Sequence, residues 1–68
     1  MSDKVYKHIA VTACSSRSFE HAIELAVEKA AETLHGIAWF EVKEMRGAIK
    51  DGKPNEWQVT VKVAFKVD

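Results

Sequence analysis

The sequence has few of the features that covalent cross-links, nucleic-acid binding or membrane insertion require. It contains one cysteine, and its 10 Lys and Arg residues are balanced by 10 Asp and Glu residues. The single thiol of Cys14 cannot form an intrachain disulfide, so we expect a reducing, cytoplasmic location. A net charge of zero argues against a nucleic-acid partner, whose binding depends on phosphate neutralisation. No run approaches the roughly 18 apolar residues of a membrane span, and the charged first segment predicts no signal peptide.

The apolar content, by contrast, indicates a folded chain. Hydrophobic residues make up 47% of the 68 residues, which is too many for a disordered protein. The lack of repeats and linkers predicts one small domain that spans residues 1–68. A domain of this length buries only about 60% of the surface that its unfolded chain exposes. Its stability margin is therefore small, and we expect the chain to form a homo-oligomer.

The N-terminal half predicts one strand followed by one helix. Residues 5–12 are rich in β-branched and aromatic side chains, and most of the apolar ones share one parity. Serine hydroxyls in the segment 14–18 are candidate N-caps for a helix that runs to about Leu34. Apolar residues recur in this helix at spacings of three and four, at Phe19, Ala22, Ile23, Ala26, Val27, Ala30 and Leu34. Gly36 is the residue expected to end it.

The C-terminal half predicts two further strands. Residues 37–46 alternate with a period of two, and glycine and proline in the segment 47–55 predict a turn region. In residues 57–67 the odd positions are apolar and most even positions are polar, which predicts one core face and one exposed face. The order β-α-β-β predicts an α+β fold, with a three-stranded, mostly antiparallel sheet wrapped around one helix. That helix covers only one face of the sheet.

Trp39 is predicted to lie on the uncovered face. Phe40 and Val42 form the natural core pair of its strand, so Trp39 points to the same side as Gln58. If the two C-terminal strands form a hairpin, the indole and the amide are near each other and suit a planar heterocycle. The other interpretation is that Trp39 packs in a subunit interface, where tryptophan is enriched. The spacing alone leaves both interpretations open.

Two segments of the C-terminal half carry a family resemblance. They are Trp39-Phe40-Glu41-Val42-Lys43-Glu44-Met45-Arg46-Gly47 and Glu56-Trp57-Gln58-Val59-Thr60-Val61-Lys62-Val63. Both resemble the dodecin family of small flavin-binding proteins. The resemblance extends to the start of the chain, the serine-rich helix entry and the helix end, and so covers nearly the whole chain. It implies a β-α-β-β subunit and a hollow homododecamer with cubic symmetry.

The resemblance also implies roles for four residues. Flavins bind in stacked pairs between symmetry-related tryptophans, and Trp39 matches this tryptophan while Gln58 matches the glutamine that bonds the isoalloxazine edge. Arg46 matches an arginine that holds the phosphate of flavin mononucleotide (FMN), and Lys66 matches a basic residue used in nucleotide contacts. Strict alternation places Arg46 on the other face of the sheet from Trp39. Contact between Arg46 and the phosphate therefore requires a strand end, a bulge or a neighbouring subunit. The alternatives are a surface ion pair for Arg46 and a solvated side chain for Lys66.

The function that the resemblance implies is storage, buffering and sequestration of FMN, or of riboflavin, with protection against flavin photochemistry. We expect no enzymatic activity, because the indole and the second flavin cover both faces of each flavin. The alternatives are an oligomeric carrier of another nucleotide cofactor such as coenzyme A, a structural assembly, and a small redox enzyme. The three histidines have no cysteine or carboxylate at zinc-ligand spacing, so no metal site is expected within one subunit.

Overall fold

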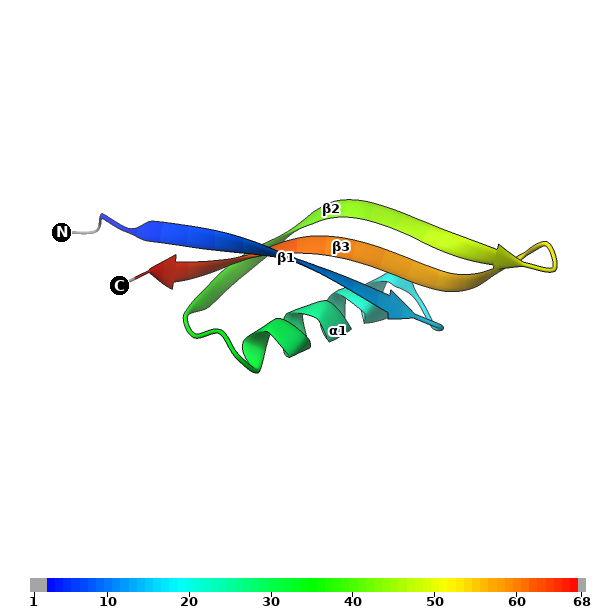
Figure 1. The fold of residues 1–68 in the computed structure, drawn as a ribbon, viewed down its shortest axis with the longest axis horizontal. Helices are drawn as coiled ribbons and strands as arrows, with labels where there is room; N and C mark the ends of the chain where they lie inside the picture. Colours follow the sequence, from blue (N-terminus) through cyan, green and yellow to red (C-terminus); the bar gives the residue numbers. More distant parts are fainter. Residues whose placement is uncertain (1–2, 68) are drawn as a thin grey trace.

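The computed structural model describes residues 3–67, which form one helix and three strands (Figure 1). Along the chain these are β1 (Val5–Ser15), α1 (Phe19–Ala31), β2 (Ile37–Lys50) and β3 (Lys53–Val67). The sheet is antiparallel with the order β1-β3-β2, and α1 packs against one of its faces. The predicted α+β fold with the order β-α-β-β is confirmed. The ends of the predicted domain, residues 1, 2 and 68, lie outside the described residues.

The start of α1 is fixed by serine hydroxyls. Ser18 is the N-cap, and its hydroxyl accepts a hydrogen bond of 3.0 Å from the backbone N–H of His21. The buried hydroxyl of Ser15 accepts a hydrogen bond of 2.9 Å from the N–H of Arg17. These bonds satisfy backbone donors that the first helical turn and the loop before it leave free. The predicted serine cap is confirmed.

The end of α1 differs from the prediction. The apolar spacing predicts a helix to about Leu34, whereas the structure ends it at Ala31. The N–H of Leu34 still bonds to the carbonyl of Ala30 at 3.0 Å, so Leu34 packs against the core from the turn that follows the helix. Gly36 has a φ of +72° and redirects the chain into β2, a conformation in which glycine has no steric penalty. Gly36 is therefore part of the connection and not the helix cap.

The core lies between α1 and the centre of the sheet. Its buried side chains are Ala22, Ala26 and Ala30 of the helix and Val59, Val61 and Val63 of β3. The alanines are four residues apart and form one narrow stripe, so the helix approaches the sheet closely. The valines are the odd positions of β3, which confirms the predicted core face.

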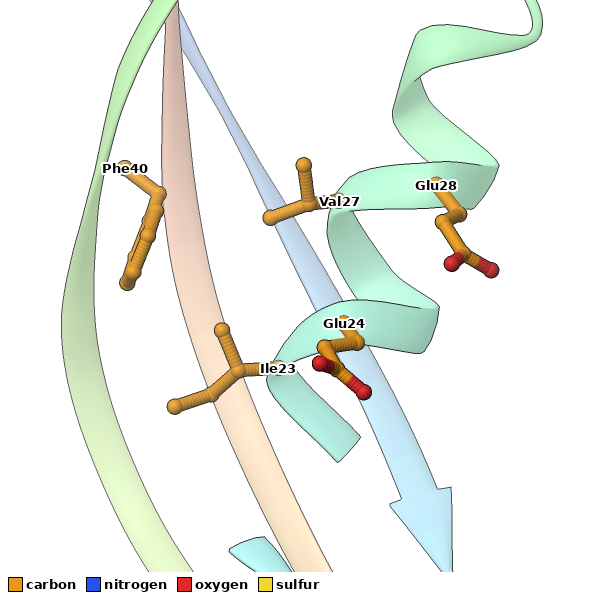
Figure 2. Close-up of a pocket in the computed structure, with 5 residues that line it drawn as sticks. All are labelled: Ile23, Glu24, Val27, Glu28 and Phe40. Atoms are coloured by element: carbon orange, nitrogen blue, oxygen red, sulfur yellow. The ribbon is translucent and has the colours of Figure 1, made fainter. Parts of the chain in front are cut away.

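The core covers β2 poorly. The helix rests mainly on β1 and β3, so Phe40 and Val42 point to the helix side of the sheet yet remain 46% and 38% exposed. An open groove of about 340 Å³ runs between α1 and β2 (Figure 2). It is lined by Ile23, Glu24, Val27, Glu28 and Phe40. One subunit thus leaves apolar surface on β2 without cover from its own helix.

The strands β2 and β3 are longer than predicted, and the turn between them is shorter. The segment 47–55 was expected to be a turn region, but the turn consists of Asp51 and Gly52 alone. Their φ values of +53° and +76° are those of a two-residue turn that matches the twist of the strands. Gly47 lies inside β2 and not in the turn. A glycine is needed there because a Cβ atom would come within 2.8 Å of the carbonyl oxygen of Glu56. The glycine that suggested a turn instead permits close approach of two strands.

Candidate functional site

The face of the sheet that α1 leaves uncovered, the helix-free face, carries all four residues predicted to bind the flavin. Residues directly opposite each other in an antiparallel pair point to the same face. The even-numbered residues of β3 form the helix-free face, and they include Gln58, Ala64 and Lys66. Trp39 lies opposite Ala64, and Arg46 lies opposite Gln58. The predicted face of Trp39 and Gln58 is confirmed.

A bulge in β2 brings Arg46 to this face. Lys43 has no opposite residue in β3, so the alternation of β2 shifts by one position after it. Arg46 therefore lies opposite Gln58, whereas strict alternation predicts it on the helix side. The same shift moves Met45 to the helix side, opposite Val59, whereas strict alternation places it on the uncovered face with Trp39. Of the three ways in which Arg46 was expected to reach the face of Trp39, the structure shows the bulge.

Two rings lie beside Trp39, the predicted stacking residue. The ring centroids of Tyr6 and Trp39 are 4.7 Å apart with a tilt of 55° between the planes. The His8 ring meets the indole edge-on, with centroids 5.9 Å apart. We call Tyr6, His8 and Trp39 the aromatic cluster. The indole remains 45% exposed, so this cluster leaves a large part of it free for contact.

A second group of side chains, the polar row, consists of Glu44, Arg46, Gln58 and Glu56. The amide oxygen of Gln58 accepts a hydrogen bond of 3.4 Å from Nη1 of Arg46, and its Nε2 donates one of 2.9 Å to Glu56. Nη2 of Arg46 forms an ion pair with the carboxylate of Glu44. The ion pair expected as the alternative for Arg46 is therefore present, and a phosphate would compete with Glu44 for the guanidinium.

The aromatic cluster and the polar row lie at different ends of the helix-free face. Trp39 is opposite Ala64, which is six positions from Gln58 along β3, a separation of about 20 Å in a strand. The expected proximity of Trp39 and Gln58 within one hairpin is therefore wrong. Lys66, two positions from Ala64, is exposed at the aromatic end. One subunit does not bring the indole and the amide together, so a site that uses both requires a second subunit.

The groove between α1 and β2 lies on the other side of the sheet. Its lining residue Phe40 lies opposite the core residue Val63, and Figure 2 shows Phe40 toward the helix residues Ile23 and Val27. This groove is thus separate from Trp39. Among residues 3–67 no group of three His, Cys, Asp or Glu side chains is placed to hold a metal ion. In the same range, no helix has the length and apolar character needed to cross a membrane.

Tyr6 and His8 could not be assigned to the site from the sequence. Both are even-numbered residues of β1, and they contact Trp39 across the central strand. The alternation of β1 assigns them to the helix-free face, but their position along it depends on the register between β1 and β3. That register opposes His8 to Ala64, the same residue that Trp39 opposes from β2. Side chains on two non-adjacent strands can be matched only when both registers are known.

Known proteins share this fold along nearly the whole chain. The Dodecin family model matches residues 5–68. A curated dodecin from Thermus thermophilus is 40% identical over 65 residues, which are 96% of this chain and 94% of the relative. The solved dodecin of Streptomyces davaonensis is 39% identical with a TM-score of 0.90 and covers 98% of both chains. The calcium dodecin of Mycobacterium tuberculosis is 31% identical with a TM-score of 0.79, and it covers 94% of this chain and 91% of its own. The extent of these matches shows that the chain belongs to the dodecin family.

Proposed function

We propose that this protein stores and sequesters FMN, or riboflavin, in a homododecamer. Each flavin stacks on the Trp39 indole of one subunit and on a second flavin held by a symmetry-related subunit. The observation that carries the proposal is the partly exposed indole on the helix-free face, with two further rings beside it. A flat indole with a free surface is suited to stacking on an aromatic heterocycle. Membership of a family of flavin-binding proteins supplies the ligand class.

The proposed site combines elements from different subunits. Gln58 supplies an amide for the isoalloxazine edge, and Arg46 supplies donors for the phosphate of FMN. Because these residues lie about 20 Å from Trp39 along one subunit, the polar row of one subunit meets the aromatic cluster of another. Lys66 lies at the aromatic end and provides a positive charge near the same flavin. Arg46 favours FMN over riboflavin, since riboflavin lacks the phosphate.

The proposed assembly would also bury apolar side chains that remain exposed in a single subunit. The subunit leaves Phe40, Val42 and Met45 of β2 exposed on the helix side, and it exposes Ile49 near the hairpin. Large apolar side chains gathered on one strand indicate an interface. We propose that this surface packs between subunits of the dodecamer. The exposed thiol of Cys14 is compatible with the reducing cytoplasm that we propose as the location.

The function that we propose is binding and not catalysis. With an indole on one face and a flavin on the other, no substrate reaches the isoalloxazine ring for hydride transfer. Electron transfer from the stacked indole quenches the excited flavin, which limits photochemical damage. The site therefore holds flavin in an unreactive form.

A fluorescence titration tests this proposal. FMN and, in parallel, riboflavin are titrated with refolded apo-protein, with Trp39→Ala as the test variant and Trp57→Phe as the control. Trp57 lies opposite Gly47 on the helix side of the sheet, so its replacement leaves the stacking indole in place. We expect saturable quenching by the wild type and by Trp57→Phe, and affinity at least about tenfold weaker for Trp39→Ala.

Two results would contradict the flavin role. Wild-type affinity in the Trp39→Ala variant would remove Trp39 from the site. Absence of quenching by the assembled wild type would show that the fold carries another function, and coenzyme A or a purely structural role would then be tested next. Turnover of an added electron donor by the flavin-loaded protein would instead favour the redox enzyme.

A further inference from the structure

Ala64 is fully buried on a face of the sheet that carries no helix. It lies on the helix-free face, opposite His8 of β1 and Trp39 of β2, yet its exposed fraction is 0%. The helix cannot cover it, because α1 packs on the other face (Figure 1). The side chains near it are those of the aromatic cluster. We attribute the burial of Ala64 within one subunit to the rings of His8 and Trp39, which lie directly opposite it on the two flanking strands.

The small side chain of Ala64 is the reason that the rings meet. β1 and β2 are not neighbours, and their backbones lie about 10 Å apart on either side of β3. A larger residue at position 64 would stand between the two outer strands. With only a methyl group there, Tyr6 and Trp39 approach to a centroid distance of 4.7 Å across the central strand.

The contacts restrict the indole. A tryptophan on an open sheet face has several staggered side-chain rotamers available. Tyr6 packs against the indole at a tilt of 55°, and His8 stands edge-on to it at 84°, and both centroid distances lie in the range of interacting aromatic pairs. Tyr6 is half-buried and the closer of the two, so it limits the indole more than His8, which is exposed.

We infer that Tyr6 and, to a smaller degree, His8 are positioning residues that hold Trp39 in the orientation needed for flavin stacking. This inference rests on the proposed flavin function and adds two residues to its site. Neither residue needs to touch the flavin. An indole held before binding loses less rotamer freedom when the flavin stacks, and the flavin therefore binds more tightly.

The first test measures affinity. FMN titrations compare the wild type with Tyr6→Ala, Tyr6→Phe and His8→Ala. We expect about two- to tenfold weaker binding for Tyr6→Ala, the equivalent of one aromatic pair, and a smaller loss for His8→Ala. Tyr6→Phe keeps the ring and is expected to retain wild-type affinity. Thr12→Ala is the matched control, since Thr12 lies on the same face of β1 and hydrogen-bonds Thr60 away from the cluster.

The second test observes the indole without flavin. In a Trp57→Phe background Trp39 is the only tryptophan, so time-resolved fluorescence anisotropy reports its local motion. We expect a rapid depolarising component to grow in Tyr6→Ala and not in Tyr6→Phe. Circular dichroism of both variants separates a local change at the indole from a general loss of structure. If Tyr6→Ala does not assemble, Tyr6→Leu, which keeps apolar volume without a ring, replaces it in both tests.

The outcomes separate this inference from the proposed function. If the wild type binds FMN through Trp39 but Tyr6→Ala binds equally well, the positioning role is wrong and the flavin function stands. If the wild type binds no flavin, the proposed function is wrong, and the anisotropy alone decides whether Tyr6 orders the indole. An indole as immobile in Tyr6→Ala as in the wild type overturns the inference in either case.

Discussion

Arg46 shows how much the chemistry of this face depends on the position of one side chain. The bulge at Lys43 places Arg46 beside Gln58, where Nη1 supports the amide and Nη2 is paired with Glu44. The guanidinium is half exposed, so it can exchange the carboxylate for a phosphate. Glu44 and a phosphate are both anions and compete for the same donors. In the proposed FMN site, the strength of phosphate binding thus depends on Glu44 as well as on Arg46.

This competition predicts opposite changes in FMN affinity for two variants. Arg46→Ala is expected to weaken FMN binding about tenfold, because charge-assisted hydrogen bonds to the phosphate are lost. Glu44→Gln is expected to tighten FMN binding, because it frees the guanidinium. Fluorescence titrations with FMN measure both effects, and riboflavin is the control because it has no phosphate. Equal effects on FMN and riboflavin would show that Arg46 acts only by supporting Gln58.

At the scale of elements, the hairpin formed by β2 and β3 extends well beyond the helix (Figure 1). The 13 residues of α1 rise about 20 Å, whereas the 15 residues of β3 span about 50 Å. The outer part of the hairpin therefore has no contact with the core. Its pairing depends on the two-residue turn and on the ladder between the strands.

The turn should accordingly be a local determinant of stability. Gly52 has a φ of +76°, so Gly52→Ala is expected to cost about 1 kcal/mol. Asp51→Asn is the control, since asparagine also tolerates positive φ and is expected to leave stability nearly unchanged. Chemical denaturation followed by circular dichroism measures the difference. A loss in Asp51→Asn would indicate that the Asp51 carboxylate also stabilises the turn, and unchanged stability in Gly52→Ala would contradict the role of the backbone conformation.

The elements could be predicted from the sequence where a local pattern determines them, and less well where a partner strand does. The alanine stripe of α1, the serine cap and the valine face of β3 are periodic or local signals, and all three were predicted correctly. The bulge at Lys43 leaves no such signal, because an extra residue becomes visible only against the opposite strand. Gly47 was taken for a turn residue because close contact with Glu56 cannot be read from the strand that contains it.

The same limit applies to the candidate site. Alternation assigned Trp39 and Gln58 to one face correctly, since parity is a property of each strand. Their separation depends on the register between β2 and β3, which the sequence did not reveal. Tyr6 and His8 were missed for this reason as well, because two registers are needed to bring β1 and β2 together over Ala64. The face of Trp39 and Gln58 was predictable, whereas the face of Arg46 beyond the bulge and the distances along the sheet were not.

At the scale of the whole molecule, the subunit is an elongated body of 56 × 20 × 14 Å with an exposed indole at one end of a face and a polar row toward the other. The isoalloxazine ring of a flavin is too short to touch both Trp39 and Gln58 within one subunit. If Trp39 and Gln58 both contact one flavin, they must come from different chains. The binding site is then a property of the assembly, and disassembly should release the flavin.

Subunit mixing tests this dependence directly. Trp39→Ala and Gln58→Ala chains are unfolded, combined and refolded together, and native mass spectrometry verifies that mixed oligomers form. We expect the mixture to bind FMN more strongly than either variant alone, because some sites receive Trp39 from one chain and Gln58 from another. A mixture of Trp39→Ala with the Trp39→Ala/Gln58→Ala double variant is the control, since none of its sites contains the indole. If the first mixture binds no better than the average of its two components, the indole and the amide do not serve one flavin across subunits, and Gln58 has no part in a site built around Trp39.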